Sequence, residues 1–429
     1  MPALLTILGV LTLIVLLARL RLPLALAILA GSVVLCGVEG QGVTGTLVVL
    51  GRGLLRDRTL GLILVTALQV LLIGVLEIGG VTQRIVALTR DLLRRPAVSI
   101  AVLPALIGLL PMPGGALFSA PMVGETAAGS DTSPARLSAI NYWYRHIWEH
   151  WWPIYPGVIL AVALVGYPWL TVALAQAPLG LCMVLGGLPL LWGLPPSLRT
   201  VGPTPAPGTA RRLLVAVAPI ATIVASVVVL SPLVDRLPAG ALPETLEQCV
   251  RQVGPIATGL ALAFGVAWAQ TRLPARALLP VLRRAELRTL PLLVAAVMVF
   301  QAVLDQVGLA PQIAAELDTH HIPVLGVIVV LPFLAGAATG LAVGFVGTSF
   351  PIVLPLAATI AQGESILPYA AIAYAFGHFG QVASPIHLCM VVSNRWFGVG
   401  YGPLYRLLIP SLLATVLLSA AWLTLLVML

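Results

Sequence analysis

The hydrophobic pattern of the chain is a series of long apolar runs separated by short polar segments. In the first half we read residues 3–18, 23–38, 60–79 and 169–191 as membrane-spanning helices. In the second half the corresponding runs are 213–233, 256–269, 290–307 and 404–429. Since about 20 apolar residues of helix cross a bilayer, this pattern predicts an all-α polytopic membrane protein.

Two further apolar stretches, residues 97–128 and 324–361, are interrupted in a way that a straight spanning helix would not tolerate. The first contains Pro111, Pro113, Gly114 and Gly115 at its centre. Proline breaks the hydrogen-bond ladder of a helix, and lipid does not satisfy the backbone groups that are freed. We therefore expect two re-entrant hairpins. Each is followed by a broken helix with polar residues in it, at residues 134–164 and 367–392, and an amphipathic segment at 81–95 is expected to lie along the interface.

The order of these features recurs along the chain at an offset of 228 to 232 residues. The matching segments are 58–60 with 288–290, 103–104 with 331–332, 119–121 with 349–351, and 146–153 with 378–385. The sequence thus predicts two repeats, residues 1–195 and 212–429, joined by a Pro- and Gly-rich linker at 196–211. Each repeat has about five spans. This odd number of crossings makes the second repeat inverted relative to the first.

Composition supports a membrane location and excludes several classes of function. The chain of 429 residues is 59% hydrophobic and 9% charged, with a mean hydropathy of +1.06, whereas soluble domains carry about 25% charged residues. No polar stretch is long enough for a soluble catalytic or nucleic-acid-binding domain. Every basic residue is an arginine, which excludes chemistry based on a lysine Schiff base. The four cysteines are expected to be buried thiols that act as small apolar residues: Cys36, Cys182, Cys249 and Cys389.

If each predicted span crosses the membrane in the direction opposite to the one before it, most arginines lie on one face of the membrane. By the positive-inside rule this face is cytoplasmic, so we expect a protein of the cytoplasmic (inner) membrane with both termini outside. The arginines assigned to the opposite face are Arg52, Arg56, Arg58, Arg236 and Arg251.

The hairpin tips are the first candidate binding groups. Their unpaired backbone groups and helix N-termini suit anions, and their carbonyls can hold Na⁺. The candidate residues are Pro113, Gly114, Gly115 and Ser119 in the first hairpin, and Gly347, Thr348 and Ser349 in the second. The alternative interpretation is a kinked helix or a packing seam of small residues.

The broken helices carry the second group of candidates, because ionisable groups at membrane depth are usually functional. These residues are Asn141, Arg145, His146 and Glu149, mirrored in the second repeat by His378, Gln381 and Ser384. The alternative is a structural ion pair between Arg145 and Glu149, at i and i+4 of one helix. In that case the neighbouring tryptophans and tyrosines would form an aromatic belt at the membrane interface.

A zinc-hydrolase pattern overlaps the first broken helix. His146-x-x-Glu149-His150 fits H-x-x-E-H, in which two histidines on one helix bind zinc. A third ligand would have to come from a residue such as Glu125 or Asp131, and the second repeat keeps only the first histidine. We therefore treat a membrane hydrolase as the least favoured alternative, and expect a protein that is not an enzyme and has no catalytic residue or bound cofactor.

The blocks PMPGGALFSAP and NYWYRHIWE resemble the prokaryotic membrane family known as domain of unknown function 401. That family is grouped with the ion transporter superfamily, which includes dicarboxylate–sodium symporters, the large subunit of tripartite dicarboxylate transporters, and gluconate permeases. The resemblance implies inverted repeats with re-entrant hairpins, an elevator-type mechanism and often a homodimer. Gly347-Thr348-Ser349 is the segment most similar to the Ser-Asn-Thr type motif of the symporters.

These observations favour a secondary active transporter that moves a small organic anion, such as a carboxylate, by symport with Na⁺ or H⁺. Arg145 and His146 would attract the anion, and Glu149 would be the carboxylate that couples its movement to the ion. A cation–proton antiporter on the same scaffold is the main alternative, and a passive channel is a weaker one. The expected partners are the organic anion, the lipid bilayer and a second copy of the chain, with Na⁺ as the only ion cofactor considered.

Overall fold

The structure is a computed structural model that describes residues 2–428 except 113–114, 203, 239 and 241. About 80% of the chain is helical and no strand occurs in the described part, which confirms the predicted all-α class. The helices of the first half are α1 (Ala3–Arg19), α2 (Leu24–Val38), α3 (Gly42–Leu55), α4 (Asp57–Ile78), α5 (Val81–Leu92), α6 (Pro96–Gly108), α7 (Ala116–Thr126), α8 (Pro134–Arg145), α9 (Pro156–Val165), α10 (Trp169–Gly186) and α11 (Leu188–Leu191). Those of the second half are α12 (Thr209–Asp235), α13 (Glu244–Thr271), α14 (Leu278–Leu282), α15 (Glu286–Val307), α16 (Leu309–Thr319), α17 (Val324–Thr339), α18 (Ala342–Ala361), α19 (Leu367–Ala383), α20 (Leu388–Phe397) and α21 (Tyr401–Met428).

Seven helices of the described chain are long and apolar enough to cross a membrane, which indicates a multi-pass membrane protein. They are α4, α10 with α11, α12, α13, α15, α18 and α21. From the sequence we expected about five spans in each half, and the difference lies in the shorter helices. α1 and α2 have 17 and 15 residues, so each is about 22–26 Å long at 1.5 Å per residue. The predicted broken helices likewise consist of pairs of shorter helices.

Helices α12 to α21 follow the same order as α1 to α10, and the packing of one set recurs in the other. α6 packs on α8 as α17 packs on α19. The second parts of the broken helices cross over: α9 lies against hairpin helix α18, and α20 lies against hairpin helix α7. Each hairpin is therefore completed by a helix from the other half of the chain.

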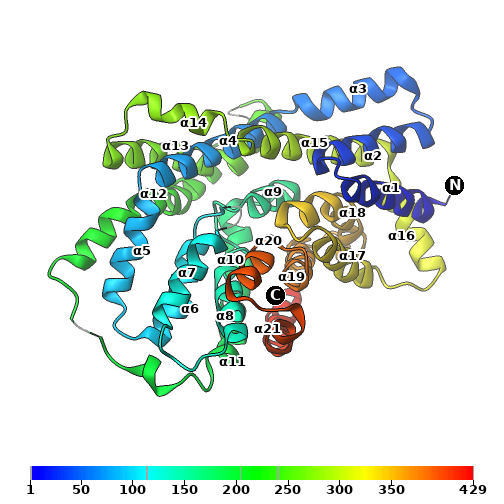
Figure 1. Cartoon of the computed structure of the whole chain (residues 1–429). Coiled ribbons are helices and arrows are strands. Elements are labelled where there is room, and N and C mark those ends of the chain that lie inside the picture. The colour runs from blue at the N-terminus through cyan, green and yellow to red at the C-terminus, as the bar shows by residue number, and fades with distance from the viewer. Residues whose placement is uncertain (1, 113–114, 203, 239, 241, 429) are drawn as a thin grey trace.

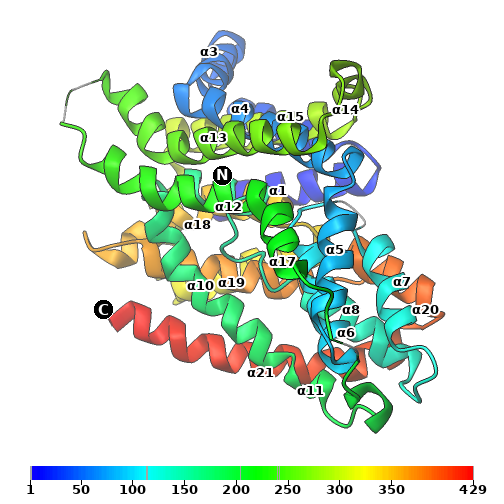
Figure 2. The same ribbon diagram turned by 90° about the vertical axis from the view of Figure 1, so that its left-hand side faces the viewer.

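The helices form two layers, which Figures 1 and 2 show from two sides. We call α1–α4 with α12–α15 the upper layer, and α6–α11 with α17–α21 the lower layer. α4 and α15 are antiparallel within the upper layer. The start of α4 meets the end of α15 through Arg56 and Asp305 at 3.7 Å, and Glu77 near the end of α4 pairs with Arg284, just before α15, at 2.7 Å.

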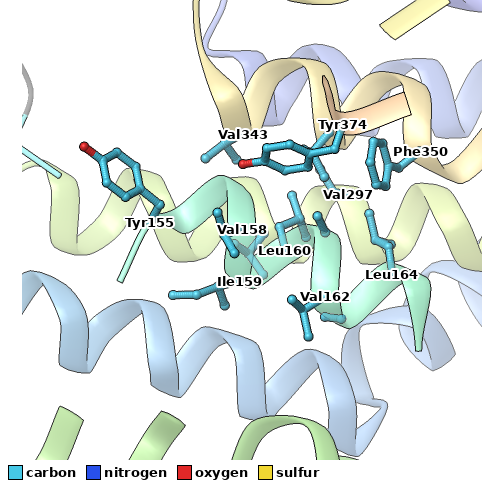
Figure 3. Packing of buried hydrophobic residues seen from close by; sticks show 14 of the residues in the cluster. Tyr155, Val158, Ile159, Leu160, Val162, Leu164, Val297, Val343, Phe350 and Tyr374 are labelled. Carbon is cyan, nitrogen blue, oxygen red and sulfur yellow. The ribbon is translucent and has the colours of Figure 1, made fainter. Parts of the chain in front are cut away.

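α9 is the point at which the two layers share a core. Every residue of α9 from Gly157 to Val165 is buried, and the helix packs on α4, α13 and α18. Figure 3 shows its side chains pointing both toward Val343 and Phe350 of α18 and toward the upper layer. α9 has only 10 residues. Gly166 at its C-terminal end is exposed, but residues 152–155, just before the helix, are buried. The chain just before α9 must therefore find partners for its polar groups away from water.

Candidate functional site

The first hairpin ends against the break between α8 and α9. The last carbonyls of α6 have no partner within the helix, and aromatic side chains from the break supply donors. Trp148 Nε1 donates to Ala105 O at 2.7 Å and Trp152 Nε1 donates to Leu109 O at 3.1 Å. Tyr155 Oη donates to the carbonyl of Gly108 in the same way.

This arrangement corrects the interpretation of the aromatic cluster as an interfacial belt. Tyr142 and Trp143 are completely buried, and each bonds a backbone carbonyl elsewhere in the chain. Tyr142 Oη donates to Val382 O at 2.8 Å, and Trp143 Nε1 donates to Met183 O at 2.9 Å. The aromatic residues therefore satisfy broken backbone inside the protein.

α8 begins at a strong local signal and ends where its functional residues start. Ser133 caps its N-terminus by accepting a hydrogen bond from Arg136 N, and Pro134 occupies the first turn, where a missing N–H costs nothing. The helix ends at Arg145, and residues 146–155 form turns. The alternative interpretation of an i, i+4 ion pair is therefore wrong, because Arg145 and Glu149 are not on one helix and form no salt bridge in the described structure.

Arg145 instead extends toward the tip of the first hairpin and toward α20. Its Nη2 donates to Met112 O at 2.9 Å, and its Nε donates to Cys389 Sγ at 3.3 Å. The side chain is only 3% exposed. Its third nitrogen, Nη1, is buried and has no hydrogen-bond partner among the described residues.

The guanidinium of Arg145 lies between the N-termini of two helices. Gly115, the N-cap residue of α7, is so close that a Cβ there would collide with the guanidinium nitrogens. Cys389 is the second residue of α20. Helix N-termini carry partial positive charge, so this buried cation faces two further positive poles. The electrostatics of this place favour an anion.

Glu149 lies where the two broken helices meet. Gln381 Nε2 donates to Glu149 Oε2 at 2.6 Å, and His378 Nε2 lies 3.6 Å from the same oxygen. His146 Nε2 is 3.8 Å from Oε1, and Tyr374 Oη donates to the Glu149 backbone carbonyl at 2.8 Å. The structure thus joins His146 with its repeat counterpart His378, and Glu149 with its counterpart Gln381.

The two histidines of the zinc-hydrolase pattern point to different neighbours. His146 Nε2 lies 2.9 Å from His387 Nε2. The ring of His150 lies against that of His378, with centroids 4.1 Å apart, and within the described part of the chain neither nitrogen of His150 has a hydrogen-bond partner. The pattern therefore does not form a helical pair of ligands here. The cluster of metal-ligand type found among the described residues is His146, His387 and Cys389.

The second hairpin turns at Gly340, which has a left-handed φ of +63° and ends α17. A Cβ at Gly340 would lie 3.1 Å from the His387 backbone and 3.3 Å from Ser384 Oγ, so this tip also lies against the break of its own broken helix. Ser384 precedes Pro385 and is extended, as the residue before a proline usually is. This ends α19, and the Ser384 hydroxyl donates to Ala337 O at 2.7 Å.

The other predicted residues of the second hairpin lie away from its tip. Gly347, Thr348 and Ser349 are inside α18, and both hydroxyls donate to carbonyls one turn earlier in that helix, those of Gly344 and Phe345. The shift arises because Gly340, and not the later glycines, adopts the turn conformation. Their role in binding remains a prediction.

The remaining predicted residues differ in their surroundings. Asn141 Nδ2 donates to Ser393 Oγ at 2.8 Å and so joins α8 to α20. Ser119 is completely buried and its hydroxyl has no partner. Pro113 and Gly114 lie outside the described residues.

Sequence reasoning did not select Cys389 or His387 as candidates. Cys389 was interpreted as a small apolar residue, and His387 follows a Ser-Pro break that has no histidine in the matching segment of the first half. One feature of the sequence could have identified His387 as a candidate. In the run Ser384-Pro385-Ile386-His387, a titratable residue directly follows a helix break.

Comparison with known proteins gives a family and a fold. The sequence profile of the family described as "Protein of unknown function (DUF401)" matches residues 2–236 and 256–428. A crystal structure of the YdaH transporter from Alcanivorax borkumensis, described as having an unusual topology, has a similar fold. Its TM-score is 0.57 at 16% sequence identity, over 90% of this chain and 88% of that one. No curated protein matches the chain in sequence.

Proposed function

The chain belongs to the DUF401 family, and we propose that it is a secondary active transporter that carries a small organic anion in symport with Na⁺ or H⁺. The fold it shares with a transporter agrees with this proposal. The proposal itself is based on the charges buried in the lower layer.

The observation that carries the proposal is the surroundings of Arg145. A buried guanidinium, placed between the N-termini of α7 and α20, has one nitrogen without a hydrogen-bond partner and no carboxylate partner among the described residues. Arginine presents several N–H donors in a plane and binds carboxylates in a fixed orientation. A small carboxylate that reaches Nη1 would also receive the backbone N–H groups of the α7 N-terminus.

Glu149 is the proposed coupling carboxylate. It is 7% exposed. Of its neighbours from the second half, Gln381 carries no charge, and His378 is neutral when its imidazole is not protonated. A cation that joins Glu149 removes an isolated negative charge from a buried position, which is otherwise costly. Binding of the anion at Arg145 and of the cation at Glu149 would leave the carrier nearly neutral as it crosses the membrane.

The antiporter alternative is less well supported by this geometry. Paired carboxylates would favour exchange of a cation for protons, and the position opposite Glu149 is occupied by Gln381. An antiporter that carries only cations would also offer no ligand to the unpartnered Nη1 of Arg145.

We further propose that the chain consists of two inverted repeats, residues 1–195 and 212–429, and works by an elevator-type movement. The matched order of helices and the antiparallel contact of α4 with α15 support inversion. In this proposal the lower layer carries the anion past the upper layer, and the upper layer forms the contact with a second copy in a homodimer. The membrane is the cytoplasmic one, with both termini outside.

A binding screen tests the proposed substrate class. The purified protein in detergent is heated with a panel of small mono- and dicarboxylates, with and without Na⁺ and at several pH values. A ligand at 100 times its Kd stabilises a protein by about 2.7 kcal/mol, so a substrate should raise the unfolding midpoint. No shift with any carboxylate, or an equal shift in an Arg145→Lys variant, would contradict the proposed anion site.

A further inference from the structure

We propose that His146, His387 and Cys389 form a binding site for a soft divalent metal ion such as Zn²⁺. The three side chains come from the two broken helices. His146 directly follows α8, His387 is the N-cap residue of α20, and Cys389 lies in the first turn of that helix. All three are at least 93% buried, with exposed fractions of 1%, 5% and 7%.

The spacing of the three ligand atoms suits one metal ion. His146 Nε2 and His387 Nε2 are 2.9 Å apart, and the two nitrogens and Cys389 Sγ all lie within 4.8 Å of one another. In a tetrahedral site with Zn–N near 2.0–2.1 Å and Zn–S near 2.3 Å, ligand atoms are roughly 3.3–3.6 Å apart. Small rotations of the side chains would therefore admit the ion.

The hydrogen bonds around His146 orient it as a ligand. Its Nδ1 lies 2.6 Å from Tyr142 O, and because a carbonyl only accepts, Nδ1 must carry the proton. In the neutral imidazole the lone pair is then on Nε2, which points toward His387 and Cys389. An N–H to carbonyl contact on the far nitrogen is the usual support of a metal-bound histidine.

Cys389 lies where a thiolate is stabilised. Its sulfur accepts a hydrogen bond from Arg145 Nε at 3.3 Å and lies at the N-terminus of α20. Both features favour the thiolate, which is the form that binds metals. On binding, the metal–sulfur bond replaces the S–H bond and one proton is released. The proton that His387 Nε2 donates to His146 Nε2 moves to His387 Nδ1, which has no hydrogen-bond partner among the described residues, and no oxidation state changes.

Glu149 offers a fourth ligand, while the other three ligands determine the preferred class of ion. Glu149 Oε1 lies 3.8 Å from His146 Nε2, within reach of a metal bound to that nitrogen. Two imidazoles with a thiolate select borderline or soft ions such as Zn²⁺ over Na⁺, Mg²⁺ or Ca²⁺, which prefer oxygen. The bound ion would connect the end of α8 with the start of α20 and so hold both breaks together.

Cobalt titration of the purified full-length protein tests this site. Co²⁺ replaces Zn²⁺ in tetrahedral sites and makes the ligands visible by absorption. We expect one equivalent of Co²⁺ to produce intense visible d–d bands and a thiolate charge-transfer band, both of which disappear when Zn²⁺ is added. Cys389→Ser should abolish the charge-transfer band and weaken binding by at least about 100-fold, since even the loss of an outer-shell partner costs about 10–100-fold.

Cys182→Ser is the matched control, because Cys182 is also a buried thiol but lies in α10. It should leave the cobalt spectrum unchanged. The proposal is overturned if the wild-type protein shows no charge-transfer band at one equivalent of Co²⁺, a result that does not depend on the folding of any variant. It is also overturned if the band persists in Cys389→Ser. Because the assay contains no carboxylate and no ion gradient, its outcome is separate from that of the transport proposal.

Discussion

Arg145 and Glu149 are four residues apart, yet they contact different parts of the chain. Arg145 reaches the first hairpin and α20, whereas Glu149 faces His378 and Gln381 of the second half. The separation follows from the end of α8 at Arg145, which turns the two side chains in different directions. In our account one residue is the anion group and the other is the coupling group.

Replacement of Arg145 by lysine should weaken substrate binding while it retains the charge. A lysine presents a point charge and cannot hold Met112 O and Cys389 while it also offers a free N–H to a carboxylate. Loss of one charge-assisted hydrogen bond costs about 1.5–3 kcal/mol, so we expect the substrate concentration for half-maximal uptake to rise at least about tenfold. Arg84→Lys, on the exposed face of α5, is the control; equal uptake by wild type and Arg145→Lys would refute the assignment.

Exchange of Glu149 with Gln381 tests the coupling role. Glu149→Gln should abolish accumulation driven by an ion gradient. In the double variant Glu149→Gln with Gln381→Glu, the site again has one carboxylate, now at position 381. It takes part in the same 2.6 Å contact from the other residue and is three residues after His378. Contacting residues couple by about 0.5–3 kcal/mol, so the double variant should recover uptake by about tenfold over the single one. Gradient-driven accumulation by Glu149→Gln alone, or no recovery in the double variant, would contradict this role.

At this scale the sequence predicted the identity of the buried polar residues better than their contacts. His146 and Glu149 were selected as ionisable groups at membrane depth, and His378 and Gln381 as their counterparts in the second half. The structure brings the four residues together around Glu149. The Arg145–Glu149 pair failed because spacing of i, i+4 has meaning only while the helix continues. Cys389 was not found because a thiol in an apolar run has no distinguishing pattern until its neighbours in space are known.

At the scale of elements, each hairpin tip fits against a helix break, and glycine makes the close contact at both. Gly115 lies against Arg145, and Gly340 lies against His387 and Ser384. That the two hairpins are re-entrant stays a prediction. The sequence did locate the turns between α6 and α7 and between α17 and α18, and both helix breaks, because Pro and Gly interrupt a helix wherever they cluster. It did not identify Gly340 as the turn, since several glycines in residues 336–347 could have adopted a positive φ.

Gly340→Ala should damage the site more than its backbone cost alone explains. A residue with a Cβ in the left-handed region loses about 1–2 kcal/mol, and at Gly340 the new methyl group would also press on His387 and Ser384. Gly398 has a similar φ of +64° with open space around it, so Gly398→Ala carries the backbone cost only. Thermal unfolding and uptake of the two variants should therefore differ, with Gly340→Ala the lower in both; equal losses would show that the tip contact has no role.

At the scale of the molecule, the upper and lower layers meet along a cavity as well as through α9. A cavity of about 400 Å³ lies between α1 and α17 and extends to Ile386 in the second break. It is lined mainly by apolar side chains, which give few directional contacts between the layers. Such an interface suits the sliding that an elevator movement requires.

A cross-link between the layers should stop transport if the lower layer moves. Leu11→Cys in α1 with Leu334→Cys in α17 places two thiols on the walls of that cavity, in a background that retains Cys389 and lacks the other native cysteines. A short thiol-specific cross-linker should reduce uptake to background, and reduction of a cleavable linker should restore it. Arg56→Cys with Asp305→Cys, both in the upper layer, is the control and should keep full uptake when linked. Unchanged uptake with the first pair linked would exclude movement of the layers past each other.

The overall class of the molecule could be predicted from the sequence because apolar runs and the 228–232 residue offset are independent of detailed packing. The packing of α9 and α20 against the opposite hairpins could not be predicted, because a single sequence does not indicate which hairpin a short apolar helix will cover. That crossing brings Cys389 to Arg145 and Gln381 to Glu149. The site is therefore a product of tertiary arrangement more than of local pattern.

The most direct test of the account is uptake by proteoliposomes of labelled carboxylates against their own gradient, with an imposed Na⁺ gradient in one arm and an imposed H⁺ gradient in the other. We predict that at least one small carboxylate accumulates above its external concentration in one arm, that an ionophore for that ion abolishes the accumulation, and that Glu149→Gln lacks it. Entry that only equilibrates the carboxylate, or no entry in either arm, would contradict coupled transport of an organic anion by this protein.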